Sequence, residues 1–172
     1  MNPKRKPPAP ILDNLTFIGN PFKQPCFSTK PFLAEKVFGA DIDFEYSLKF
    51  LYSYNGSIAT YNSYRREIER LLQWSWRIEQ VSVLNLKREH IEDFIRFCFN
   101  PPKAWIGVKN VARFKRKNDK RIANEDWRPF VASVSKSEHD KGKEANTSKF
   151  CPSQASIKGT FTALGVRRAS RT

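Results

Sequence analysis

The sequence predicts an all-α fold with a basic insertion, and three observations lead to this prediction. Apolar residues recur every three or four positions in four segments, as in helices with one buried face: 41–54, 58–76, 87–99 and 153–164. Prolines and turn residues separate these segments. The positive charge is also uneven: of the net +14 on 172 residues, +11 lies after residue 100, with +6 in 101–131 and +5 in 132–172.

The first predicted helix, residues 41–54, carries one row of apolar residues at every fourth position: Ile42, Tyr46, Phe50 and Tyr54. Leu48 and Leu51 lie near this row, and the pattern predicts an amphipathic helix. Asp41 and Asp43 fall in the first turn, where acids complement the helix dipole. The turn sequence "YNGS" then ends the helix, and Gly56 suits its C-terminus.

The second predicted helix contains the stretch "TYNSYRREIERLLQWSW", residues 60–76. Ser57 is a suitable N-cap, and an apolar side follows at Tyr61, Tyr64 and Ile68. The opposite side is polar and consists of Asn62, Arg65, Arg66, Glu69, Arg70, Gln73 and Arg77. Two interpretations of this polar side stay open: a solvated back of a core helix, or a face that contacts a polyanion.

The third predicted helix, residues 87–99, has an apolar stripe that includes Ile91, Phe94 and Cys98, and it stops at Asn100-Pro101-Pro102. A fourth helix begins near Ser153. Its stripe is Ile157, Phe161 and Leu164, at the spacing i, i+4 and i+7.

The chain divides into three parts by composition. Residues 1–40 are rich in proline and predict an extended arm that is partly ordered, with anchors that can pack onto a surface: Phe17, Phe22, Phe27 and Phe32. Residues 41–166 predict the helical domain, with an insertion at about 103–152 whose second part, 132–152, has the composition of a linker. Residues 167–172 form a basic tail.

Several classes of site are excluded by what the sequence lacks. Its three cysteines are far apart, with no C-x-x-C spacing and no histidine near them, so we expect no metal site and no disulfide framework. No glycine-rich phosphate loop or catalytic triad spacing occurs, so we expect no cofactor and no small-molecule substrate. No apolar run approaches membrane-spanning length, so we expect no membrane partner and a cytoplasmic location.

Basic and aromatic chemistry remains, and it favours a polyanionic partner. Residues 109–121 hold seven basic residues and one acid, with Trp105, Phe114, Trp127 and Phe130 around them. Lysine and arginine neutralise phosphates, whereas aromatic rings can stack on unpaired bases. Duplex DNA and single-stranded RNA are therefore both open as partners, and a disordered solubilising loop is the simplest alternative.

Three segments taken together resemble the N-terminal core-binding domain of tyrosine recombinases, the phage-integrase family. They are "GSIATYNSYRREIERLLQWSW", "LNLKREHIEDFIRFCFNPP" and "SQASIKGTFTALG". "WIGVKN" and "WRPF" also resemble an insertion found in a subgroup of bacterial integrases. The resemblance covers roughly residues 41–165 and rests on the order and spacing of these pieces.

This resemblance implies a small bundle of four helices, with a SAM-like fold, that forms one half of a clamp around duplex DNA. The second and fourth helices of the bundle face the DNA in that family. Carried over to this chain, the DNA-binding residues are Ser57, Thr60, Asn62, Ser63, Arg65 and Arg66 on one helix, Arg128 in the insertion, and Ser156, Lys158, Gly159 and Thr162 on the other.

The chain departs from the family in its catalytic residues. Catalysis there needs arginine, lysine, His-x-x-Arg and a nucleophilic tyrosine in a following domain, and no His-x-x-Arg occurs here. We therefore expect a truncated recombinase that binds DNA and has no activity of its own, with a natural stand-alone binding module as the alternative. Two rival functions are an RNA-binding accessory protein and a module that binds other recombinase subunits.

Overall fold

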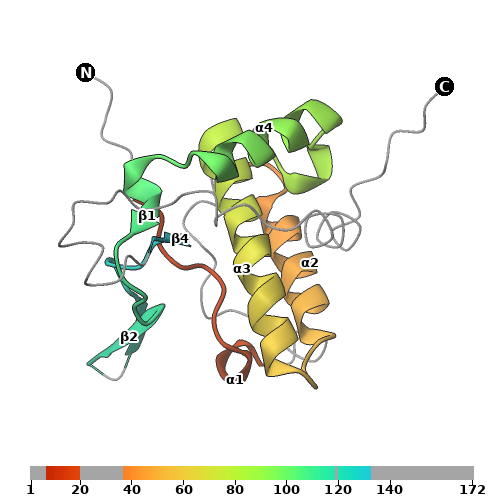
Figure 1. The fold of residues 1–172 in the computed structure, drawn as a ribbon. Helices are drawn as coiled ribbons and strands as arrows, with labels where there is room; N and C mark the ends of the chain where they lie inside the picture. Colours follow the sequence, from red (N-terminus) through yellow and green to blue (C-terminus); the bar gives the residue numbers. More distant parts are fainter. Residues whose placement is uncertain (1–6, 20–36, 119, 133–172) are drawn as a thin grey trace. The chain divides into compact units, whose positions relative to one another are not determined.

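The computed structural model describes residues 7–19, 37–118 and 120–132, which belong to two compact units (Figure 1). Residues Ile11–Ile95 contribute to a helical unit, and the described part of the second unit consists of residues 7–10, 96–118 and 120–132. The described residues are mostly helical, as predicted. The second unit contains short strands, so the fold is not purely all-α.

Three of the four predicted helices are present. They are α2 (Ala40–Tyr52), α3 (Ile58–Trp74) and α4 (Arg88–Phe99), and a short helix, α1 (Leu15–Ile18), precedes them. A π-helical turn, Ser75–Glu79, extends α3 three residues past the predicted end of the second helix, and Val83–Asn85 form a 3-10 turn. The predicted fourth helix, the linker beyond residue 132 and the basic tail lie outside the described residues.

Helices α2 and α3 lie side by side (Figure 1), and only part of the apolar pattern of α2 is buried. Phe44, Leu48 and Leu51 are buried, whereas Ile42 is 45% exposed and Tyr46 is 55% exposed. Helix α2 therefore has two apolar rows, and the row at every fourth position faces outward in its first half. The second half of that row, Phe50 and Tyr54, packs against Tyr64 of α3 at ring distances of 5.3 and 4.8 Å.

Buried Asp43 explains this orientation of α2. Its carboxylate accepts hydrogen bonds from Trp76 Nε1 (2.9 Å), the Ser82 hydroxyl (2.7 Å) and the Val83 amide (2.8 Å). A buried carboxylate needs such donors, because burial without them is costly. The predicted role of Asp43, a charge at the helix dipole, is thus secondary, since the residue joins the start of α2 to the segment that follows α3.

Helix α3 begins as predicted and supplies much of the core. The Ser57 side chain caps the helix by accepting from the Thr60 amide at 3.4 Å. Its buried apolar side includes Ile68, Leu71 and Trp74, and the Trp74 ring lies 5.3 Å from that of Phe94 in α4. One side of α3 is therefore a core face.

The polar side of α3 is covered as well, by residues 11–18 of the chain, which we call the strap. Glu69 Oε1 accepts hydrogen bonds from the backbone amides of Ile11 (2.6 Å) and Leu12 (3.1 Å). The Tyr61 hydroxyl donates to the Asp13 carbonyl at 2.7 Å. Ile11, Leu12 and Ile18 are buried, so this part of residues 1–40 packs on the helical unit.

The predicted aromatic anchors of the arm have two different outcomes. Phe17 is exposed, so the strap is held by aliphatic side chains and by backbone hydrogen bonds rather than by this ring. Phe22, Phe27 and Phe32 lie outside the described residues.

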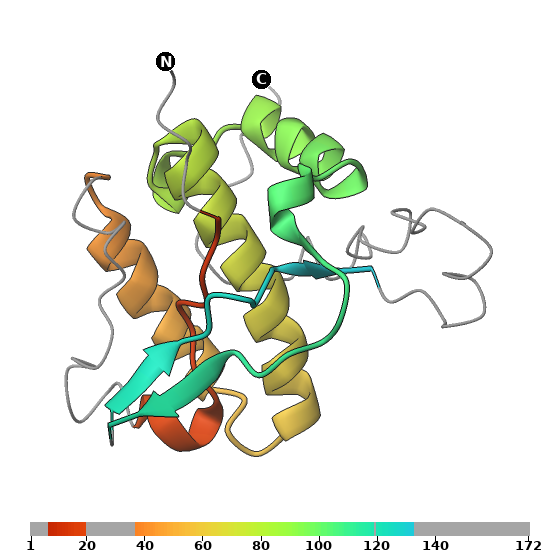
Figure 2. The same cartoon turned by 90° about the vertical axis from the view of Figure 1, so that its left-hand side faces the viewer.

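The second unit has two small pairs of strands. Strand β1 (Ile106–Gly107) pairs in parallel with β4 (Phe130–Val131), and β2 (Phe114–Lys117) pairs antiparallel with β3 (Lys120–Ala123). In Figure 2 the β2–β3 hairpin extends away from β4. The rings of Phe97, Trp105 and Phe130 pack together beside the first pair, with Phe97 4.9 Å from Trp105 and 6.1 Å from Phe130. The basic insertion is therefore folded over residues 103–118 and 120–132.

Across the part of the chain that the structure describes, no helix is both long and apolar enough to cross a membrane.

Candidate nucleic-acid interface

The N-terminal end of α3 gathers the small polar residues that the resemblance assigns to DNA. The Ser57 and Thr60 hydroxyls lie 2.9 Å apart, and Asn62 and Ser63 follow within the first turns of the helix. Ser57 and Ser63 are exposed, while Thr60 and Asn62 are half-buried. A helix N-terminus with hydroxyl groups can donate hydrogen bonds to phosphate, so this end suits a phosphate contact without being specific for one.

Arg65 and Arg66 have different environments, although the sequence treats them as a pair. Arg66 is exposed. Arg65 is only 8% exposed, because its guanidinium donates to the Asn14 side chain and lies 5.6 Å from the centre of the Tyr61 ring. Burial lowers the pKa of Arg65, the nearby charge of Arg66 lowers it further, and Tyr61 and Asp13 oppose the change. Arg65 therefore holds the strap on α3 and is buried, whereas only Arg66 of the predicted pair is exposed.

This difference predicts separate effects of two single substitutions. Arg65→Ala should lower the free energy of unfolding by about 2 kcal/mol, since it removes a buried hydrogen bond and ring packing. Arg66→Ala should change stability by no more than about 0.5 kcal/mol, as is usual for a surface position. Urea unfolding of both variants measures this, and equal loss of stability in the two would contradict the assignment.

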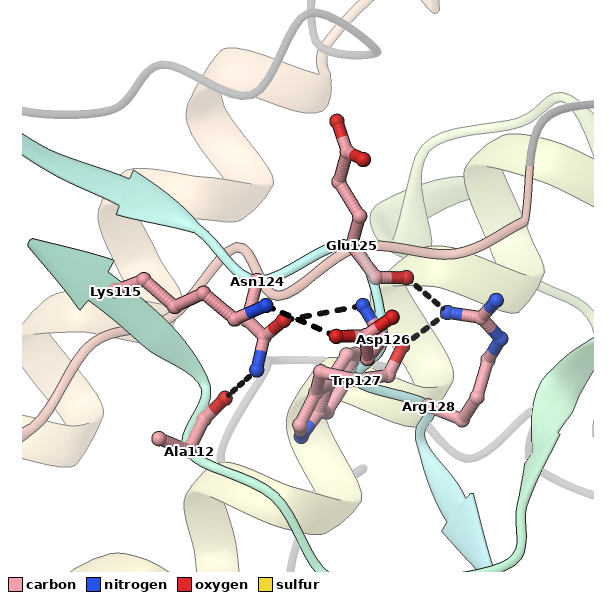
Figure 3. Close-up of polar contacts among 7 residues, drawn as sticks. All are labelled: Ala112, Lys115, Asn124, Glu125, Asp126, Trp127 and Arg128. Atoms are coloured by element: carbon pink, nitrogen blue, oxygen red, sulfur yellow. Dashed lines mark hydrogen bonds and ion pairs between the residues drawn. The ribbon is translucent and has the colours of Figure 1, made fainter. Parts of the chain in front are cut away.

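Arg128 is the one predicted site residue of the insertion, and the structure gives it a local role. One terminal nitrogen of its guanidinium donates to the backbone carbonyls of Glu125 and Trp127 (Figure 3). The side chain is half-buried and still borders a shallow groove of about 400 Å³, which Lys109 and Asp126 also line. Ser156, Lys158, Gly159 and Thr162, the other predicted DNA-binding residues, lie outside the described residues.

The β2–β3 hairpin concentrates the basic charge of the second unit. Its register places Arg116 opposite Arg121, and Lys117 opposite Lys120. Like charges directly opposite each other in a sheet are destabilising, and side chains at such positions have Cβ atoms roughly 5 Å apart. The Lys117–Lys120 rung is exposed, and it favours binding of a polyanion because an anion beside it relieves the repulsion.

The turn of the hairpin explains why so charged a segment can form strands. Asn118, the first residue after β2, has a φ of 48°, in the left-handed region. Asparagine tolerates this conformation better than most residues, and two-residue turns of this hand match the twist of paired strands. At the other end Phe114 is buried and anchors β2.

A polar turn at residues 124–128 supports the base of the hairpin (Figure 3). The Asn124 side chain donates to the Ala112 carbonyl at 2.6 Å and accepts from the Asp126 amide at 3.1 Å. The Arg113 guanidinium lies 4.6 Å from the centre of the Trp127 ring. These contacts fix the two ends of the hairpin to one turn.

Asp126 is the acid that faces the hairpin lysines from this turn. Its carboxylate lies 2.9 Å from Lys115 Nζ (Figure 3). The hydrogen bond and the charge of Lys115 lower the pKa of Asp126, with further contributions from Lys109 and Arg128. Three cations thus surround one carboxylate, and the region keeps an excess of positive charge.

Removal of this carboxylate should strengthen binding to a polyanion. Asp126→Asn frees Lys115 for a phosphate and removes one negative charge. We therefore expect the affinity for duplex DNA to rise about threefold at low salt, an amount typical of one exposed ion pair. Fluorescence anisotropy with a labelled duplex measures the change. Because the pair is exposed, melting should hardly shift, and a variant with unchanged or weaker affinity would contradict this role of Asp126.

Sequence reasoning missed the hairpin because its basic residues resemble those of a solvated loop. Two signals were present: an Asn-Asp turn pair at 118–119, and an aromatic or β-branched residue on each side of it, Phe114 and Ile122. Among the residues with described positions, no group of histidine, cysteine or acidic side chains could hold a metal ion.

Comparisons with known proteins identify no relative: no family model, no curated protein and no solved structure matches this chain.

Proposed function

We propose that this chain binds duplex DNA and is the DNA-binding portion of a site-specific tyrosine recombinase. The single observation that carries the proposal is the β2–β3 hairpin, in which the exposed side chains of Lys117 and Lys120 lie opposite each other on strands with a fixed base. Polyanion binding relieves their repulsion and releases counterions from the nucleic acid. The recombinase assignment rests on the resemblance of the sequence, and the order of α2, α3 and α4 agrees with the helix order that it implies.

The burial of the aromatic residues favours duplex DNA over single-stranded RNA. Recognition of unpaired bases usually needs exposed rings on which the bases stack. Trp105, Phe114, Trp127 and Phe130 of the insertion are all buried in the second unit. The aromatic residues that made RNA an open alternative are therefore core residues, whereas the exposed lysines and arginines suit a phosphate backbone.

In this proposal the polar end of α3 contributes phosphate contacts. Ser57, Ser63 and Arg66 are exposed near this end and can donate to phosphate oxygens. The proposed arrangement is a four-helix core-binding domain in which residues 153–164 supply the last helix and its DNA contacts. The role is binding and not strand cleavage, because the family's catalytic residues belong to a different domain.

A competition experiment tests the proposed function. The chain is bound to a labelled DNA duplex of mixed sequence, and unlabelled duplex DNA or single-stranded RNA of equal length is added. We expect duplex DNA to compete at least tenfold better. Preference for the RNA would overturn the proposal and support the accessory RNA-binding alternative, whereas retention of a full-length recombinase without DNA, and no DNA binding, would support the subunit-binding alternative.

A further inference from the structure

We propose that the hairpin lies in the major groove of B-form DNA and that Ile122 reads thymine there through its methyl group. The proposal rests on the proposed function, because it specifies how the hairpin contacts the duplex. It adds a specificity-determining residue to a surface that otherwise attracts DNA of any sequence.

One face of the hairpin is exposed along its whole length. The pairing of Lys115 with Ile122, and of Lys117 with Lys120, puts these four side chains on the same face, which we call the lysine face. All four residues of this face are exposed. The opposite face begins with buried Phe114, and the Arg121 guanidinium lies 5.2 Å from the centre of that ring. Only the lysine face can therefore lie flat on a partner.

Ile122 is unusual in its position on this face. It is 41% exposed, and its neighbours on the face are lysines: Lys115 directly across, and Lys120 two residues earlier on the same strand. Single exposed isoleucines are common on protein surfaces and alone carry no meaning. Here, however, the apolar side chain has lysines as its neighbours on both strands. A complementary partner therefore has an apolar group with negative charges on both sides of it.

The major groove of B-form DNA has this arrangement. It is about 12 Å wide, it admits a two-stranded ribbon, and thymine presents a methyl group on its floor. Phosphates line both edges of the groove, within reach of lysines on the two strands of the hairpin. The major groove of an A-form RNA helix is too narrow and deep for the same insertion. The chemistry of the lysine face thus fits duplex DNA that contains thymine.

The experiment removes the thymine methyl without changing base pairing. A duplex with high affinity is first selected from a randomised library with the unmodified chain, and each thymine is then replaced in turn by deoxyuridine. We expect one or two positions at which the change weakens binding about three- to fivefold, the effect of removing one buried methyl group. The same positions should have no effect on the Ile122→Ala variant, which should bind the original duplex with correspondingly lower affinity.

Leu84→Ala is the matched control, because Leu84 is 45% exposed and lies in the other unit. This control should keep the sensitivity to deoxyuridine of the unmodified chain. Thermal melting of both variants shows whether each is folded, and a smaller change at the same position, Ile122→Val, should keep part of the sensitivity if Ile122→Ala fails to fold.

Each other outcome has a definite meaning. Duplex binding that is insensitive to deoxyuridine at every position overturns the methyl contact and leaves the proposed function standing. Equal sensitivity in Ile122→Ala or Ile122→Val and in the unmodified chain overturns the role of Ile122. Failure to bind any duplex overturns the proposed function itself.

Discussion

Reversal of both lysines in the outer rung of the hairpin, Lys117→Glu with Lys120→Glu, will weaken duplex DNA binding about a hundredfold at low salt. Each reversal replaces an attraction of about 1 kcal/mol at close range in water by a repulsion of similar size, reduced in part by screening. The hairpin itself should stay folded, because a pair of opposing glutamates replaces a pair of opposing lysines and the repulsion across the rung is similar. Anisotropy titrations with a fixed duplex measure the affinity.

The control must carry the same change in net charge elsewhere. Lys49→Glu with Arg88→Glu also removes four units, taking +14 to +10, and both residues lie on helices far in sequence from the hairpin. This control should weaken binding by no more than about fivefold, through the weaker overall field. Equal weakening in the two double variants would mean that net charge, and not the hairpin, attracts the DNA.

The second large effect concerns stability. Asp43→Ala should lower the free energy of unfolding by about 4 kcal/mol, because it leaves the Trp76, Ser82 and Val83 donors without their acceptor in a buried place. Domains of this size have only about 5–15 kcal/mol of stability, so much of the helical unit's margin would disappear. Urea unfolding followed by circular dichroism gives the value.

Asp41 provides the comparison for this substitution. It lies in the same first turn of α2 but is exposed, so Asp41→Ala removes only a dipole interaction, about 0.5 kcal/mol. Similar destabilisation by Asp41→Ala and Asp43→Ala would refute the claim that Asp43 joins α2 to the segment after α3.

The helices were predictable because their apolar spacing is strong and their ends are marked. Ser57 begins α3 as a cap, and Asn100 with two prolines follows α4. The choice of buried face on α2 was not predictable in this way. Both of its rows are apolar enough to form a buried face. The buried face is decided by Asp43, which accepts three hydrogen bonds from residues far away in the sequence, and the periodicity of α2 does not predict these bonds.

The polar side of α3 shows a second limit of reasoning from sequence. Glu69 and Arg65 look solvent-facing on a helical projection, yet both are buried by the strap. The strap amides and the Asn14 side chain lie at least 51 positions away along the chain, so only the fold brings them to these residues. Arg65 of the predicted site on α3 is a buried structural residue, whereas the exposed residues of that site are Ser57, Ser63 and Arg66.

In the insertion, the high charge led to the opposite error, because a folded segment was not recognised. Its composition predicted a basic region correctly, but the aromatic residues that seemed available for bases form its core. Strands as short as β2 and β3, with lysines and arginines at most positions, have weak intrinsic preference for a sheet. Their pairing depends on the Asn118 turn and on the hydrogen bonds of Asn124 at the base.

The salt dependence of duplex binding tests most directly the claim that the hairpin binds DNA phosphates. Affinity for one duplex is measured from low to physiological salt for the unmodified chain and for Lys117→Ala with Lys120→Ala. We expect the logarithm of the association constant K to fall steeply and linearly with the logarithm of the salt concentration. The slope should be shallower by roughly 1.8 in the double variant, because each phosphate that the protein no longer neutralises changes it by about 0.9. Parallel lines for the two proteins, or a flat response of the unmodified chain, would contradict it.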